Sequence, residues 1–101
     1  MSIPVQPFAY TKGFPSLTLS GTTTSSQVRL DPNSPQVMVD SYGSSDVTYI
    51  RWGSGNQTAV TSDMRIPPGT VQVFSKGKAD TLAGICGVST STLIITNGTG
   101  N

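Results

Sequence analysis

Thr70-Val71-Gln72-Val73-Phe74-Ser75 has valine at its second and fourth positions. Successive side chains of an extended chain point to opposite faces, so this spacing predicts a strand with one buried face. The same period of two returns in residues 17–19, 27–30 and 36–40. We therefore expect a chain built from short, half-buried strands.

Turn residues separate these runs from further strand-like segments, which are apolar on both faces. The latter cover residues 47–52, 81–88 and 92–96. Pro68 and Gly69 suit the two central positions of a type II turn, in which Gly69 supplies a positive φ. About seven or eight short strands spaced by about 8–12 residues predict an all-β fold, either a small antiparallel β-sandwich or a jelly-roll-like barrel.

The predicted core consists of the apolar residues at alternating positions of these runs. They are Leu17, Leu19, Val28, Leu30, Val37, Val39, Ile50, Val71, Val73, Leu82 and Ile94.

The first fifteen residues differ in character from the rest. Pro4, Pro7 and Pro15 disfavour regular structure there, which predicts an extended N-terminal arm over residues 1–15 and a single β-domain over residues 16–101. The arm is too apolar for a free tail, so we expect it to pack on the domain or, by preference, on another chain. Its apolar candidates for partner binding are Ile3, Val5, Phe8, Tyr10 and Phe14.

Composition excludes several classes of protein. The 101 residues carry a net charge of +1, and only 11% of them are charged, while Ser, Thr, Gly and Pro are abundant. Scattered cations make no nucleic-acid footprint, and no apolar run reaches the roughly 20 residues of a membrane-spanning helix. The N-terminus lacks the basic and apolar regions of a secretory signal, so we expect synthesis in the cytoplasm.

The residues needed for catalysis or metal binding are scarce. There is no His, no Glu and a single Cys, which excludes the usual zinc sites, and Cys86 is expected to be a small buried side chain. A Ser–Lys pair of Ser75 with Lys76 or Lys78 is conceivable, but these residues lie in what the sequence predicts to be a solvated turn. We expect no enzyme activity, no cofactor, no metal and no small-molecule substrate.

Aromatic residues are the better candidates for a functional surface. Tyr49 and Trp52 face opposite sides of a regular strand, and Phe74 faces away from the side of Val71 and Val73. Either loops cover the aromatic residues left outside the core, or they bind a partner. Aromatic residues and arginines are enriched at interfaces, so Tyr49, Arg51, Trp52 and Phe74 join the candidates for partner binding.

An ordered series of strand and turn motifs spans residues 16–100. It consists of Leu17-Thr18-Leu19-Ser20-Gly21, Val28-Arg29-Leu30, Ile50-Arg51-Trp52-Gly53, Asp63-Met64-Arg65-Ile66-Pro67-Pro68-Gly69, Val71-Gln72-Val73-Phe74-Ser75 and Ile94-Ile95-Thr96-Asn97-Gly98. The series resembles the small proteins encoded among the structural genes of tailed phages and prophages.

This resemblance implies a virion structural protein made in the host cytoplasm. The first expectation is a capsid decoration or cement protein, a homo-oligomer that binds the major capsid protein and stabilises the shell. The second is a head–tail, tail or fibre component that contacts host glycans through Tyr42, Tyr49 or Trp52. A third, outside the resemblance, is a cytoplasmic binding module unrelated to virions.

Overall fold

The structure, a computed structural model, describes residues 9–10 and 16–99. These residues form strands joined by turns and loops, with no helix among them. The strands are β1 (Ala9–Tyr10), β2 (Leu17–Gly21), β3 (Ser26–Arg29), β4 (Gln36–Asp40), β5 (Thr48–Gly53), β6 (Met64–Ile66), β7 (Val71–Ser75), β8 (Thr81–Cys86) and β9 (Ser91–Thr99).

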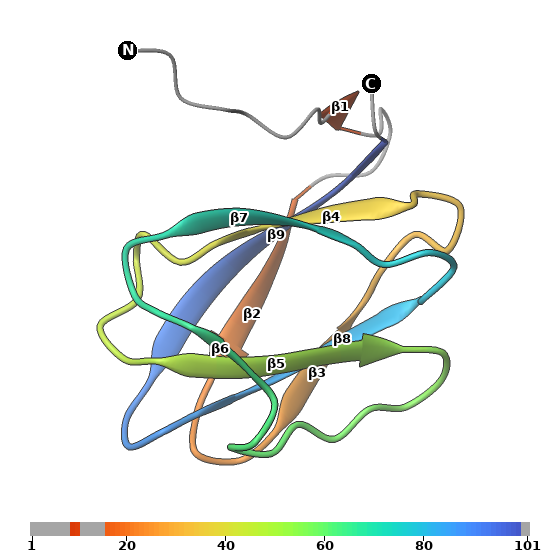
Figure 1. The fold of residues 1–101 in the computed structure, drawn as a ribbon. Helices are drawn as coiled ribbons and strands as arrows, with labels where there is room; N and C mark the ends of the chain where they lie inside the picture. The colour runs from red at the N-terminus through yellow and green to blue at the C-terminus, as the bar shows by residue number, and fades with distance from the viewer. Residues whose placement is uncertain (1–8, 11–15, 100–101) are drawn as a thin grey trace, which may run out of the picture.

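Two antiparallel sheets face each other (Figure 1). In the five-stranded sheet, β9 lies between β2 and β4, β4 lies between β9 and β7, and β1 pairs with the end of β9; the four-stranded sheet has the order β3-β8-β5-β6. The pairs β2–β9, β3–β8, β4–β7 and β5–β6 are nested one inside the next along the chain. One long hairpin rolled into two sheets gives this order, which is that of a jelly roll. The predicted all-β sandwich is therefore confirmed.

The core lies between the sheets and follows the strand alternation. Of the predicted core residues, Leu19, Leu30, Val37, Val39, Ile50 and Leu82 are buried. Leu17 and Val28 are half-buried and pack against them. Ile66, Leu93 and Ile95 complete the buried cluster.

Three predicted core residues lie outside it. Val71, Val73 and Ile94 were expected in the interior, but they lie on the outer face of the five-stranded sheet, and Val71 is 47% exposed. In β7 the face that carries Phe74 is turned to the interior. Phe74 stands opposite buried Val37, and its ring covers more apolar area than a valine side chain. In β9 the neighbours Leu93 and Ile95 are both buried, so Ile94 between them must face outward.

The turn between β6 and β7 is built as the sequence predicts. Gly69 has φ 77°, a value that only glycine adopts readily. The Ser41 hydroxyl donates to the Pro67 carbonyl (2.7 Å) and accepts from the Thr70 amide (3.0 Å), which ties this turn to the end of β4. β6 itself, only three residues long, was not predicted.

Part of the predicted arm pairs with the chain's own sheet. In β1, Ala9 lies opposite Thr99, and Tyr10 lies opposite Gly98. The other four arm candidates, Ile3, Val5, Phe8 and Phe14, lie outside the described residues.

Candidate functional site

The outer face of the five-stranded sheet carries a group of apolar side chains. Strand register places Val73 beside Met38, and in the next row Val71, Asp40 and Ile94 lie side by side. Val71 is 47% and Ile94 is 37% exposed. Such side chains on adjacent strands, about 4.8 Å apart, form one continuous surface.

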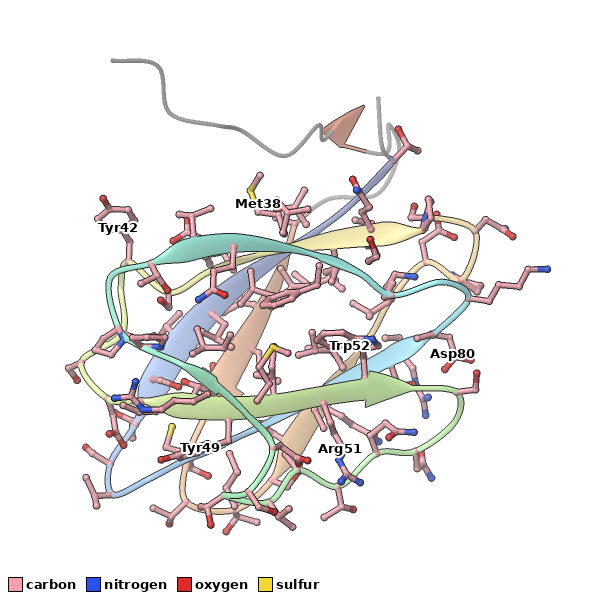
Figure 2. All side chains as sticks on the ribbon, viewed as in Figure 1. Met38, Tyr42, Tyr49, Arg51, Trp52 and Asp80 are labelled. Atoms are coloured by element: carbon pink, nitrogen blue, oxygen red, sulfur yellow. The ribbon has the colours of Figure 1, made fainter. Side chains whose placement is uncertain are left out.

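Tyr42 extends this surface beyond the end of β4. It is 74% exposed, and its amide is held by the Asp40 carboxylate at 2.9 Å. In Figure 2, Met38 and Tyr42 project from the same side of the five-stranded sheet, which is the upper sheet in this view, and point away from the interior. We call Met38, Tyr42, Val71, Val73 and Ile94 the outer patch.

The outer patch lies on a face with little charge. The residues that β2, β4, β7 and β9 direct outward are otherwise hydroxyl, amide or glycine residues, and Asp40 is the one charged residue among these described positions. Exposed apolar patches of this kind mark binding surfaces, provided that a partner also hydrogen-bonds the Asp40 carboxylate and the hydroxyl groups that it covers. This face can therefore bind a complementary apolar protein surface.

Trp52 and Phe74 face the interior, although both were candidates for partner binding. Their ring centroids are 5.1 Å apart with an interplanar angle of 41°, and both pack against the buried cluster. Figure 2 shows Trp52 between the sheets. This placement gives the pair a packing role at the half-buried margin of the core.

Tyr49 and Arg51 lie on the outer face of the other sheet (Figure 2). Arg51 donates from Nε and a terminal nitrogen to the two carboxylate oxygens of Asp63, both at 3.0 Å. The Arg51 guanidinium, together with the Val60 amide, lowers the pKa of Asp63. Arg51 thus binds the loop between β5 and β6 to the sheet, and its charge is paired with that of Asp63 in the same chain.

The alternatives expected for glycan contact, Tyr42, Tyr49 or Trp52, lie in three different places. Tyr42 lies outside the upper sheet, Tyr49 outside the lower sheet, and Trp52 between the two (Figure 2). No single ligand can contact all three.

A polar cleft of ≈ 430 Å³ lies between the start of β3 and the loop that follows β5. Its amide groups already bind one another: Gln27 donates to the Asn56 side chain (3.2 Å) and accepts from the Gln57 amide (2.9 Å). Arg29 also donates to the Asn56 side chain at 2.8 Å. These hydrogen bonds hold the loop after β5 against β3.

Lys76 departs from the solvated turn that was predicted for it. It is buried, and its ammonium donates to the carbonyls of Asp31 (2.7 Å) and Ala79 (2.8 Å). Burial lowers the pKa of Lys76, against the opposing effect of the Asp31 and Asp80 carboxylates. Because the buried ammonium is directed to these two carbonyls, Lys76 does not form a pair with the outward-facing Ser75.

Cys86 is buried, as predicted. Its thiol lies 3.0 Å from the Ser91 hydroxyl, which also accepts from the Thr48 hydroxyl at 2.6 Å. Within the described part of the chain, no cluster of three or more His, Cys, Asp or Glu side chains could hold a metal ion, and no helix is long and apolar enough to cross a membrane.

Sequence reasoning missed the outer patch because it assigned three of its members to the core. A usable signal was present in β7: placing the largest apolar residue, Phe74, in the interior sends Val71 and Val73 outward.

Comparison with models of protein families, with curated proteins and with solved structures found no match.

Proposed function

We propose that the chain is a structural protein of a tailed-phage virion, a capsid decoration protein that binds the assembled shell through the outer patch. The observation that carries this proposal is the outer patch, an apolar surface on the outer face of the five-stranded sheet that is interrupted by Asp40. The jelly-roll strand order adds support by analogy alone, because the fold occurs in viral capsid proteins but also in lectins and cupins.

Shell binding of this kind needs no large interface per copy. A protein that binds only the assembled shell stabilises it by mass action, because the shell cannot come apart before the protein is released. Many weak contacts between the protein and the shell, repeated over the lattice, add up. Where neighbouring copies also contact each other, each bound copy raises the effective concentration of the next one at the shell. The partner would be the major capsid protein, and the chain would reside in the virion.

The experiment compares the thermal disruption of purified phage heads with and without the protein. Ile94→Lys places a charge on the outer patch, beside Asp40, without touching a sheet edge. Val60→Lys is the matched control, because Val60 is 44% exposed, compared with 37% for Ile94, and lies in the loop after β5. We expect wild type and Val60→Lys to raise the disruption temperature and Ile94→Lys to have no effect.

Salt dependence and stoichiometry complete the test. Binding through a weakly charged face should persist at raised ionic strength, unlike binding through a basic patch. Mass spectrometry of virions should find the chain in copy numbers comparable with the major capsid protein. A few copies per particle, with no binding to heads, would favour the head–tail, tail or fibre alternative and overturn the decoration role.

A further inference from the structure

Among the described residues, β7 is the edge strand of the five-stranded sheet and pairs only with β4. Hydrogen bonds from the Ser41 amide to the Thr70 carbonyl and from the Lys76 amide to the Pro35 carbonyl, both 2.8 Å, fix the pattern of this pairing. Such bonded pairs recur every second residue in an antiparallel ladder, so Gln72 and Phe74 are the β7 residues whose backbone groups point to β4. The N–H and C=O groups of Val71, Val73 and Ser75 therefore point away from the sheet.

This edge lacks the features that normally prevent strand addition. Val71–Ser75 contains no charge and no proline, and its register with β4 runs without a bulge. Natural edge strands are usually short, charged, bulged or covered. The edges of the other sheet follow that rule: β6 has only three residues and carries Arg65, while β3 carries Arg29 and is contacted by the loop after β5.

The β7 edge is also continuous with the outer patch. Val71 and Val73 offer their backbone groups to the edge and their side chains to the outer face. In Figure 1, β7 crosses in front of β9 and β2, on the side of the sheet nearest the viewer.

We propose that two copies of this chain pair through β7, antiparallel, about a twofold axis at Val73. Val73 then lies opposite Val73 of the second copy, and Val71 lies opposite Ser75 of the second copy. Of the possible registers, this one alone uses the outward backbone groups of all three residues from both strands. The contact is self-complementary, as a twofold interface requires, and it opposes no like charges.

The pairing joins the two five-stranded sheets into one and places both outer patches on the same face. Residues directly opposite in a ladder share a face, so Val73 of each copy lies at the centre of the combined surface. A second copy fits this edge better than the chain's N-terminal residues 1–8. Pro4 and Pro7 fall on alternate sides of an extended strand, so either orientation of that segment loses a donor to the edge.

A cysteine pair tests the register. Residues opposite each other in a bonded pair have Cα atoms about 5.5 Å apart, which is within the range that a disulfide spans. Val73→Cys should therefore give a covalent dimer under mild oxidation, seen on a non-reducing gel. Val71→Cys is the matched control, because its two copies would lie about 14 Å apart, and the native Cys86 is buried.

Val73→Pro tests the hydrogen bonds. The Val73 amide points away from β4, so proline there leaves the sheet's own ladder intact while it removes both central donors of the dimer. Sedimentation should show a concentration-dependent dimer for wild type and for Val73→Thr, and about a tenfold or greater rise in the dissociation constant for Val73→Pro. Circular dichroism should show an unchanged strand spectrum for all three.

Two results would overturn the proposal: a wild-type protein that stays monomeric at every concentration, or cross-linking of Val71→Cys as readily as Val73→Cys. Neither measurement involves phage heads. These experiments can therefore disprove the dimer without disproving shell binding, and the experiments on phage heads can disprove shell binding without disproving the dimer.

Discussion

Trp52 shows how one side chain closes the margin of the core. Its ring packs against Phe74 across the two sheets and is half-buried. We expect Trp52→Ala to lower the free energy of unfolding by about 3 kcal/mol, because removal of the ring leaves a cavity that the sheets cannot fill. Urea unfolding measures the loss. Tyr49→Ala, on the outer face of the same strand, should cost clearly less, and equal losses would place Trp52 outside the core.

Gly84 leaves room for a side chain of the opposite sheet, that of Leu19. A methyl group on Gly84 would meet Leu19 Cδ2 at 2.5 Å and Thr48 Cγ2 at 3.3 Å. We expect Gly84→Ala to destabilise the protein by about 1–3 kcal/mol through overpacking. Gly43→Ala is the control, since its new methyl group would have no neighbour within 4 Å. A thermal melt that treats the two variants alike would contradict this account.

At the scale of elements, Lys76 joins two turns that are far apart in sequence. Its ammonium binds the carbonyl of Asp31 in the turn before β4 and the carbonyl of Ala79 in the turn before β8. Lys76→Met leaves both carbonyls without this donor, so we expect a loss of about 1–3 kcal/mol in urea unfolding. Lys78→Met, at an exposed position two residues further on, should change stability by no more than about 0.5 kcal/mol.

Strands and turns were predictable from the sequence where local chemistry decides them. The alternation in residues 36–40 and the Pro68-Gly69 turn needed no knowledge of the rest of the chain. β6 escaped prediction because three residues are too few to show a period, and it exists through pairing with β5.

The candidate surface was less predictable than the fold. A strand's period tells which residues share a face, but not which face is covered, and for β7 the answer depends on Phe74 meeting Val37 on a strand over thirty residues away. The buried Lys76 was missed for a related reason. Its partners are backbone carbonyls, which leave no trace in the sequence.

At the scale of the whole molecule, several aspartates stabilise loops in their charged form. Asp46 accepts from the amides of Val88 and Ser89, and these bonds lower its pKa. Hydrogen bonds from Ser34 and Thr81 lower the pKa of Asp31 and Asp80 in the same way, and the Arg51 guanidinium lowers that of Asp63.

These shifts set the expected response to acid. A carboxyl whose pKa is lower in the folded state binds fewer protons there than in the unfolded chain. Its contribution to stability is therefore full above the ordinary Asp pKa of about 3.9 and is lost as pH falls towards the lowered value. We expect the urea midpoint to be constant from pH 7 to 5 and to fall below about pH 4. Asp46→Asn should reduce that fall, and a midpoint that rises in acid would contradict the assignment.

The place of β9 in the sheet also determines when the molecule can be completed during synthesis. β9 is the last described strand along the chain, yet it lies in the interior of the five-stranded sheet, between β2 and β4. Until residues 91–99 leave the ribosome, the two halves of that sheet have no strand to join them, and both carry open edges. Folding of the sheet must therefore wait for residues 91–99, and a nascent chain that stalls before them is left with strand edges open to aggregation.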